Sequence, residues 1–413
     1  MHALVYHYNF PDLYKQKYGL GDEIATDASP EERLLIAGST KTSFYSFTQN
    51  ILGYNEYTEN NAVVWYTSPN CLDSEKVTAD TVFGTAGTDG GETHLYCKWV
   101  PILTEEASLQ GTDYVFNLST HEQLIYLSYL INSGLSYSRD AVSMLYAKAN
   151  YKITSAINLE ETYKFYEYLT GSGFGAEETQ LAFAPIGTNG FEGTFDGGNF
   201  TITLNITTNA VNTLTGTTTT DNIGLFAKLN NATITNVTLA GKVVGSTTNR
   251  IKVTVGALAG YAENSTLSNI NSSASVTADF GFVGGIVGEM LLTKANVALT
   301  GLTSTSISVT NNGAKSYGTC STGGVIGLLT NQSTNTISGW TNNSSVIGSG
   351  NVGGIIGNLQ SSAGLTISST TNAGRISSNS VDGGAGIGGI IGSLNLASSG
   401  SAQTLEIKEN SHT

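Results

Sequence analysis

Histidines are the side chains of this chain best suited to acid–base, nucleophilic or metal chemistry, and they are unevenly distributed. The five histidines are His2, His7, His94, His121 and His412. Only His412, close to the last residue, follows the repetitive second half of the sequence. Most nucleophilic mechanisms need a histidine base, and many zinc sites need histidine ligands. The repeats therefore lack the residues for most histidine-based nucleophilic and metal mechanisms.

The carboxylates of the repeats are few and scattered. They are Glu192, Asp196, Asp221, Glu263, Asp279, Glu289 and Asp382. Polysaccharide hydrolysis needs two carboxylates on either side of the scissile bond. These acids do not recur in phase with lysines or arginines, so we expect no catalytic residue and no enzymatic activity. A polysaccharide-active enzyme remains the alternative, with Asp196 and Asp221 as first candidates, although Asp196 is better interpreted as a turn residue.

The sequence also gives no sign of a metal or cofactor site. Residues Thr88-Asp-Gly-Gly-Glu92 resemble a calcium loop only superficially, because they lack the alternating Asp and Asn ligands of such loops. A hairpin turn is the better interpretation. We expect neither a bound metal nor a cofactor.

The three cysteines are too few for a disulfide-rich scaffold. Cys71 and Cys97 lie close enough in sequence to pair within one small domain, and Cys320 has no evident partner. A Cys71–Cys97 disulfide and three free buried thiols are both compatible with the sequence.

Aromatic residues are concentrated before the repeats, and two interpretations apply to them. Exposed aromatic side chains often anchor contacts with proteins or sugars, which makes Tyr126, Tyr129 and the isolated Trp340 candidate contact residues. The other interpretation is packing in the core, with Trp340 filling a corner.

Elements that could position these residues are readable from the pattern. The alternating or aromatic runs 4–9, 62–67, 93–99 and 151–159 predict strands. Ser29-Pro-Glu-Glu32 predicts a short helix start. Residues Ser119 to Glu122 fit a capping box for a helix ending near Gly134.

A glycine-bracketed apolar unit recurs through the second half. Copies start at residues 223, 256, 284, 323, 353 and 388, so they lie 33, 28, 39, 30 and 35 residues apart. The bracketing glycines are Gly256, Gly260, Gly284, Gly288, Gly323, Gly327, Gly353, Gly357, Gly388 and Gly392. A strand-rich unit of this length buries its apolar side only by stacking on its neighbours. We expect the glycines at corners, where they permit positive φ and close backbone approach.

The N-terminal hundred residues resemble the Listeria–Bacteroides repeat, also called the internalin B-repeat. The motifs that carry the resemblance are Trp65-Tyr-Thr-Ser-Pro-Asn-Cys71, Val77-Thr-Ala-Asp80 and Leu95-Tyr-Cys-Lys-Trp99. Cys97 stands where the family usually has alanine. The resemblance implies a small β-grasp-like module found in arrays on bacterial surface proteins.

Residues 115–400 resemble the GLUG-repeat proteins of bacterial surfaces. A short helix, an alternating strand, Pro185-Ile-Gly187 and Phe191-Glu-Gly-Thr-Phe-Asp-Gly197 lead into the glycine-bracketed repeats in the family's order. This resemblance implies a right-handed parallel β-helix, and the helix near residues 120–133 would cap its first coil.

Together these observations predict an all-β chain of four segments. They are a β-grasp-like module (1–102), a linker and helical cap (103–175), a parallel β-helix (176–405) and a polar tail (406–413). The net charge of −14 makes a nucleic-acid or anionic-membrane partner unfavourable, and no apolar run is long enough to span a membrane.

We expect an extracellular bacterial cell-surface protein, an adhesin-like stalk or binding module whose partner is a host-surface protein or glycan. The alternative is a self-assembling structural subunit that joins copies of itself through an uncapped C-terminal coil. No signal peptide or anchor motif is recognisable in the sequence.

Overall fold

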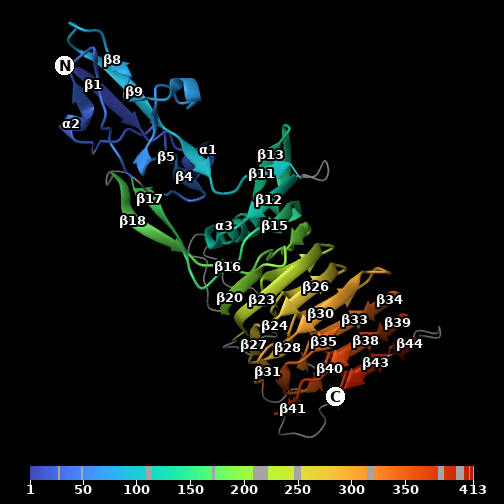
Figure 1. Ribbon diagram of the computed structural model, residues 1–413. Helices are drawn as coiled ribbons and strands as arrows, with labels where there is room; N and C mark the ends of the chain where they lie inside the picture. Colours follow the sequence, from blue (N-terminus) through green and yellow to red (C-terminus); the bar gives the residue numbers. More distant parts are fainter. Residues whose placement is uncertain are drawn as a thin grey trace. The chain divides into compact units, whose positions relative to one another are not determined.

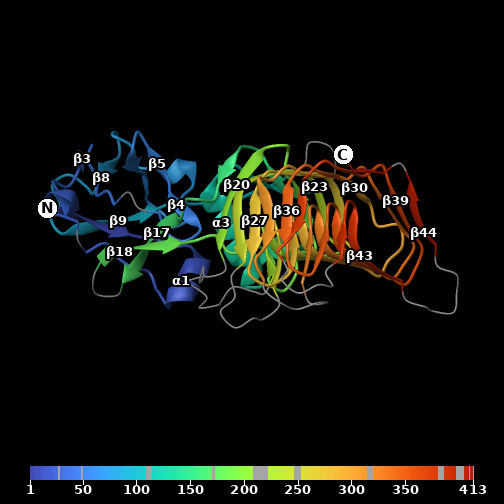
Figure 2. The same ribbon diagram turned by 90° about the horizontal axis from the view of Figure 1, so that it is seen from below.

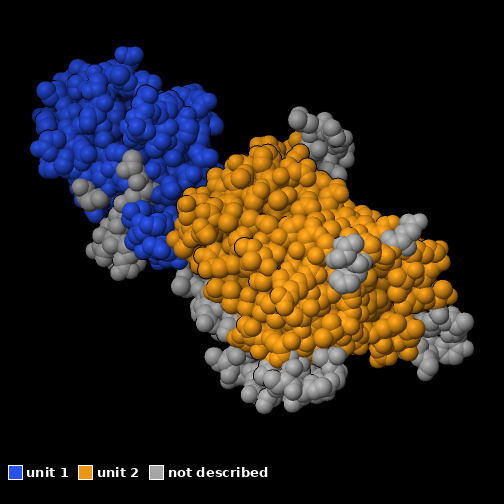
Figure 3. Space-filling model, turned by 60° about the horizontal axis from the view of Figure 1, so that its bottom comes forward, with its two compact units in different colours: residues 1–104, 164–180 blue, residues 105–163, 181–413 orange. Residues whose placement is uncertain are grey.

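The computed structural model describes residues 1–26, 28–47, 50–107, 114–169, 173–207, 222–245, 253–313, 320–379, 386–396, 404–408 and 410–412. Strands dominate and helices are few, so the expected all-β class is confirmed (Figure 1). The chain divides into two compact units (Figure 3). Unit 1 comprises residues 1–104 and 164–180, and unit 2 comprises residues 105–163 and 181–413. No helix in the described ranges is long and apolar enough to cross a membrane.

The main sheet of unit 1 has the strand order β2-β1-β9-β7. Strand β1 (His2–His7) runs parallel to β9 (Gly91–Cys97), and β2 (Leu34–Leu35) and β7 (Trp65–Tyr66) run antiparallel on the outside. Three strand pairs complete the unit: β3 (Ser39–Thr40) with β8 (Val82–Phe83), β4 (Tyr54–Glu56) with β10 (Trp99–Pro101), and β5 (Thr58–Glu59) with β6 (Ala62–Val63). The predicted strands at 4–9, 62–67 and 93–99 fall on β1, on β6 and β7, and on β9 and β10.

Aromatic rings fill the core of unit 1. Trp65 is fully buried, contacts the rings of Tyr6, Tyr45 and Phe47, and donates its indole N–H to the Tyr45 carbonyl at 2.8 Å. Because the indole N–H is satisfied, this large residue can be buried without the penalty of an unpaired donor. The early tyrosines are therefore largely core residues.

The helices of unit 1 are short. Helix α2 (Pro30–Arg33) begins with the expected capping box, in which Ser29 and Glu32 bond reciprocally. Helix α1 (Asp12–Tyr18) was not expected from the sequence; it ends at Gly19, whose φ of 66° is the left-handed conformation that suits glycine. A 3₁₀ turn, η1, spans Asp73–Glu75.

Most of the hairpin formed by β17 (Tyr163–Leu169) and β18 (Gly173–Leu181) belongs to unit 1, although the sequence places residues up to 175 in the linker and cap. The Tyr18 hydroxyl donates to the Glu167 carboxylate at 2.5 Å, and the Tyr166 amide donates to the Asn50 carbonyl at 2.8 Å. These bonds join the hairpin to the N-terminal module.

Unit 2 contains two six-stranded sheets in which successive strands are parallel and ordered along the chain (Figures 1 and 2). The first sheet consists of β21 (Asn222–Ile223), β24 (Val253–Gly256), β28 (Gly281–Gly284), β32 (Ser321–Gly323), β37 (Asn351–Gly353) and β42 (Ile387–Gly388). The second consists of β22 (Phe226–Asn230), β25 (Ala259–Glu263), β29 (Val287–Leu292), β33 (Ile326–Asn331), β38 (Ile356–Ser361) and β43 (Ile391–Leu396).

A third set of nineteen strands completes unit 2. It comprises β11 (Glu105–Ala107), β12 (Tyr114–Leu118), β15 (Asn150–Ile153), β16 (Ile157–Asn158), β19 (Thr194–Asp196), β20 (Thr201–Thr207), β23 (Thr233–Gly245), β26 (Thr266–Ser272), β27 (Ser275–Ala278), β30 (Leu299–Ser304), β31 (Ser308–Asn311), β34 (Asn335–Ser338), β35 (Thr341–Asn342), β36 (Ser345–Gly348), β39 (Leu365–Ser368), β40 (Thr371–Asn372), β41 (Ile376–Ser378), β44 (Leu405–Lys408) and β45 (Ser411–His412). Strands β11 and β12 pair antiparallel, whereas β12 onward pair parallel. The residues expected as a polar tail thus include β44 and β45, which pair with β39 and β40.

The glycine-bracketed unit forms the corner between the two six-stranded sheets. Its first glycine ends a strand of the first sheet, and these glycines stand in register from Gly256 to Gly388. A Cβ on Gly353 would lie 1.9 Å from the Ile356 carbonyl oxygen, and the same holds for Gly323 and Ile326. Close backbone approach therefore requires these glycines.

The expectation of positive φ at the bracketing glycines is wrong, since none of them has a positive φ. Asparagines supply the left-handed residues at several turns of the stack instead, with φ of 54° at Asn231, Asn236 and Asn269. Asparagine tolerates this conformation better than most residues, because its short polar side chain bonds locally to the backbone.

The interior of unit 2 combines apolar columns with buried amides. Val287, Ile326 and Ile356 stand in one in-register column and are fully buried. Asn342 donates to Asn372 at 2.7 Å, and both side chains are fully buried. Each amide also bonds to the backbone of its own coil, so the buried polar atoms are satisfied.

Helix α3 (His121–Asn132) lies against the first layer of unit 2. Its capping box uses Thr120 and Gln123, one residue later than the expected Ser119 and Glu122. Asn132 accepts from the amides of Gly187 and Thr188 and donates to the Pro185 carbonyl at 2.9 Å. The Pro-Ile-Gly segment is therefore a docking site for α3. A hairpin of β13 (Ser136–Arg139) and β14 (Val142–Leu145) and a 3₁₀ turn, η2 (Tyr146–Lys148), follow.

Candidate functional site

The three aromatic residues proposed as contact anchors are not exposed. Trp340 is fully buried and donates its indole N–H to the Leu299 carbonyl at 3.2 Å, so the contact interpretation is wrong and it fills the interior. Tyr126 is buried, stacks on the half-buried Tyr129, and meets Tyr163 edge-on. These tyrosines pack α3 in place, and do not form an open patch.

The acidic alternatives do not form a catalytic pair in the described residues. Asp196 accepts from the Gly198 amide at 2.9 Å and from the Asn236 side chain at 3.0 Å, which is the turn role expected for it. Asp221 lies outside the described residues. Within the described ranges, no group of three or more His, Cys, Asp or Glu side chains converges as a metal site would require.

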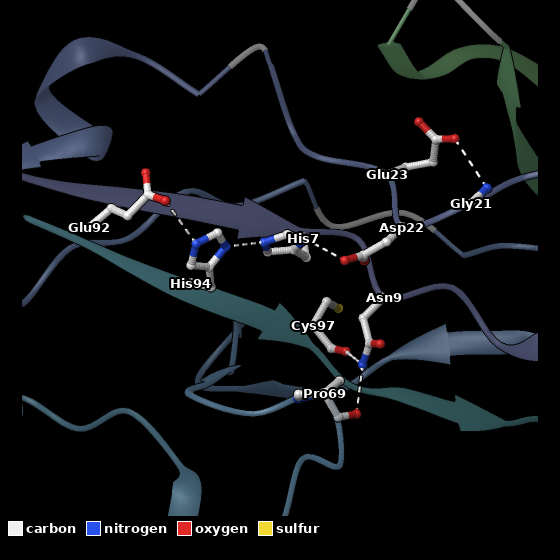
Figure 4. Close-up of polar contacts among 9 residues, drawn as sticks. All are labelled: His7, Asn9, Gly21, Asp22, Glu23, Pro69, Glu92, His94 and Cys97. Atoms are coloured by element: carbon white, nitrogen blue, oxygen red, sulfur yellow. Dashed lines mark hydrogen bonds and ion pairs between the residues drawn. The ribbon is translucent and has the colours of Figure 1, made fainter.

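A chain of ionisable side chains does occur in unit 1, on the parallel strands β1 and β9 (Figure 4). His7 Nε2 lies 2.7 Å from His94 Nδ1, and His94 Nε2 lies 3.1 Å from Glu92 Oε1. At the other end, His7 Nδ1 is 3.1 Å from Asp22 Oδ2. We call these four residues the histidine chain. Its members form a line and do not converge on a point, as the ligands of a metal ion would.

His7 is the buried member of the histidine chain. Its ring stacks on Tyr96 with the ring centroids 4.6 Å apart, and its Nδ1 lies near Asp22 without a hydrogen-bond partner among the described residues. The chain thus contains two hydrogen bonds, one between His7 and His94 and one between His94 and Glu92.

Two buried thiols and Asn9 lie at the ends of the same strands, so a thiol nucleophile must be considered. The Asn9 amide donates to the carbonyls of Pro69 and Cys97, both at 3.0 Å, and approaches the Cys71 sulfur at 3.6 Å. Burial raises the pKa of Cys71 to about 11 and that of Cys97 well above its ordinary value. Both cysteines are free thiols. Since a thiolate is the reactive form, neither sulfur is activated.

An open hollow of about 360 Å³ lies beside these residues. Its lining comprises Asn9, Phe10, Pro11, Asp12, Lys15, Tyr54, Pro69, Asn70, Cys71, Lys98 and Trp99. Five of these residues, from Asn9 to Lys15, follow the end of β1, and two follow the end of β9. Because β1 and β9 are parallel, their carboxyl ends meet at one edge of the sheet. We call this cavity the N-terminal hollow.

The N-terminal hollow combines ring surfaces with charged and amide groups. Trp99 donates its N–H to the Tyr8 carbonyl at 2.7 Å, and its ring stacks on Phe10. Burial, with a smaller effect of Asp12, raises the pKa of Tyr54. Lys15 forms no ion pair with a described carboxylate, so its ammonium group is free to meet a ligand.

Sequence reasoning identified His7 and His94 as ionisable but did not bring them together, and it missed Asp22, Asn9 and Lys15. No local sequence signal could have brought these residues together, because strands β1 and β9 pair although they lie near opposite ends of the N-terminal segment of unit 1. The resemblance did draw attention to the segments that contain Cys71, Lys98 and Trp99.

Comparison with known proteins adds little. No family model matches the chain, and no curated protein matches it. Among solved structures, a Bacteroides ovatus protein described as a "putative immunoglobulin A1 protease" aligns with a TM-score of 0.43 and 16% sequence identity. The alignment covers 75% of this chain and 88% of that one. A likeness this distant establishes neither a shared fold nor a shared activity.

Proposed function

We propose that this chain is a non-enzymatic bacterial cell-surface protein of the GLUG-repeat type. Unit 2 would be a right-handed parallel β-helix that serves as a stalk, and unit 1 would be a β-grasp-like module that binds a glycan or protein of a host surface. The right hand is the one that parallel strand crossovers adopt almost without exception. The location would be extracellular.

One observation carries the stalk function: the in-register columns of unit 2 have an uncharged interior. Positions such as Val255, Val283 and Val352 are fully buried, and the buried polar residues among the described part of unit 2 are serines, threonines and asparagines. Stacked coils of this kind gain their stability from each neighbour interface. The repeated residues of unit 2 are those that stacking requires. We therefore interpret unit 2 as a stalk that carries unit 1.

The N-terminal hollow supports the binding function. It offers aromatic rings, amide groups and the Lys15 ammonium group, which has no ion-pair partner among the described residues, in a space large enough for a sugar ring or a side chain. Its residues do not supply an activated nucleophile, since burial keeps both nearby thiols protonated. This combination favours recognition over group transfer.

The test is binding by the full chain on a glycan array and on purified host-matrix proteins. We expect a defined ligand whose binding falls at least tenfold in the double variant Lys15→Ala/Asn70→Ala. Lys152→Ala, which removes an exposed ammonium group from unit 2, is the matched control and should bind as the unmodified chain does. Absence of any ligand, or equal binding by the hollow variant, would remove the proposal.

A self-assembling structural subunit is the second candidate, since coils that stack by a repeated interface can in principle stack between copies as well. Negative-stain electron micrographs of the purified chain separate the two functions: filaments indicate assembly by repeated addition, whereas discrete particles indicate a display stalk. Release of reducing sugar from polysaccharides would instead support the enzyme alternative.

A further inference from the structure

The charged side chains that line the N-terminal hollow are predominantly basic. Lys15, within α1, and Lys98, directly after β9, each contribute an ammonium group, and Asp12 contributes the one carboxylate of the lining. Neither lysine forms an ion pair with a described carboxylate. The hollow is therefore locally positive in a chain whose net charge is −14.

The ammonium group of Lys98 lies close to the wall of the hollow. Its Nζ is 5.2 Å from the ring centroid of Tyr57 and 5.5 Å from that of Tyr66. Burial raises the pKa of Cys71, and the positive charge of Lys98 is one of the effects that oppose this increase, so the ammonium group acts on a residue of the lining. Lys98 and Lys15 are both half-buried. Water screens a half-buried charge less than an exposed one, so these two ammonium groups attract an anion more strongly than fully exposed lysines would.

The carboxylate of Asp12 has a structural explanation of its own. Asp12 is the first residue of α1, where the positive end of the helix dipole favours a negative charge. It is also exposed, so solvent screens it more than it screens the two lysines. The carboxylate therefore offsets only part of the positive potential in the hollow, which favours an anionic ligand over a cationic one.

The uncharged part of the lining fits a sugar better than an acidic peptide. Trp99 is half-buried with its ring stacked on Phe10, which fixes an aromatic surface in the lining. Asn70 is exposed, and its amide can both donate to and accept from a hydroxyl group. The volume of about 360 Å³ is near the lower limit for small-molecule sites. A space of this size suits one or two sugar rings, with their C–H faces against the aromatic surface, and not an extended peptide.

We infer that the ligand of the N-terminal hollow is a glycan that ends in an anionic sugar, one that carries a carboxylate or a sulfate group. The anionic group would contact the ammonium groups of Lys15 and Lys98, and the ring would pack against Trp99. Asn70 would bond to a hydroxyl group of the sugar. This inference rests on the binding function proposed above and adds the chemical class of the ligand.

The test begins with the full chain on an array of neutral, sialylated, uronic-acid-containing and sulfated glycans. The strongest acidic ligand and the same glycan without its charged group, such as sialyllactose and lactose, are then compared by titration calorimetry. We expect the acidic form to bind at least about tenfold more tightly at about 50 mM salt, and the difference to shrink at about 500 mM, because salt screens the two ammonium groups. Whether the carboxylated or the sulfated glycans bind identifies the anionic group.

Charge variants provide an independent readout in both directions. Lys15→Gln and Lys98→Gln should each weaken binding of the acidic glycan about fivefold or more and leave binding of its neutral form unchanged. Asp12→Asn removes the carboxylate of the lining and should strengthen binding of the acidic glycan about two- to fivefold. A gain in affinity cannot result from misfolding. Lys152→Gln, at an exposed lysine of unit 2, is the matched control and should bind as the unmodified chain does.

The outcomes separate this inference from the proposed function. Equally tight binding of a neutral glycan, lost in Lys15→Ala/Asn70→Ala, would overturn the anionic sugar and leave the binding function in place. Unchanged affinity for the acidic glycan in both lysine variants would also overturn it, as would tighter binding of hexaglutamate than of any acidic glycan. Absence of any ligand would remove the binding function itself. Circular dichroism confirms that each variant is folded.

Discussion

At the scale of single residues, burial decides which groups can act. Cys71, Cys97 and Trp340 are residue types that could react or bind, and all three are buried. In the histidine chain only His7 is buried, whereas the carboxylates of Asp22 and Glu92 at its two ends are exposed. Most of the potentially reactive side chains therefore serve as packing residues.

The thiols provide a direct test of this burial. Because the neutral thiol is favoured in the folded state, the native chain should not react with a thiol reagent such as DTNB at pH 7.5, and should react after denaturation. The raised pKa of Cys71, about 11 instead of 9.0, also contributes stability below pH 9 that is lost as the pH rises toward 11. Rapid labelling of the native chain at neutral pH would contradict this assignment.

Removal of His94 should destabilise unit 1. In His94→Ala the buried His7 Nε2 loses its only described hydrogen bond, which we expect to cost about 1–3 kcal/mol in the free energy of unfolding. Glu92→Ala, which removes an exposed carboxylate at the end of the same chain, is the control and should change stability by about 0.5 kcal/mol or less. Urea unfolding measures both. Equal effects of the two variants would show that the imidazole pair is not a structural contact.

At the scale of elements, the glycine corners and the capping helix explain how short strands become a stack. The corner glycines let the backbones of two sheets approach, and α3 covers the apolar side chains of the first layer. Asparagine serves two roles, as the left-handed turn residue outside and as the ladder of amides inside. The corner glycines and the buried asparagines both make contacts between neighbouring coils. A substitution in one coil is therefore expected to disturb the coil next to it.

Gly353→Ala tests the corner directly. The new methyl group would lie 1.9 Å from the Ile356 carbonyl oxygen, so the backbone must shift, and we expect unit 2 to lose about 1–3 kcal/mol or more. Gly364→Ala is the matched control, since its nearest neighbours would be Thr334 side-chain atoms at 3.7 Å. Thermal unfolding followed by circular dichroism compares the two. A fully stable Gly353→Ala would show that the corner has room to adjust.

At the scale of the whole molecule, the chain is built from two units with different cores. Unit 1 packs aromatic rings around Trp65, whereas unit 2 stacks aliphatic columns and amides. Residues 164–180 belong to unit 1 although they lie between segments of unit 2. Separate cores of this kind allow the units to unfold independently.

We expect two unfolding transitions in urea. The tryptophans separate them, because Trp65 and Trp99 lie in unit 1 and Trp340 lies in unit 2. Fluorescence of Trp340→Phe should follow unit 1 alone, and His94→Ala should shift that transition while Gly353→Ala leaves it unchanged. A single transition that both variants shift would show that the two units form one cooperative system.

The sequence by itself determined the strand-rich class, the repeat, the corner glycines and the approximate position of the helix next to the first coil. These are local or periodic properties, and stacking repeats the same environment at each period. Only the tertiary structure decided that Trp340 is internal, that His7 meets His94, and that residues 164–180 join unit 1. Each of these three features depends on which distant strands pair and on which residues cover a side chain. The spacing of residues along the chain determines neither.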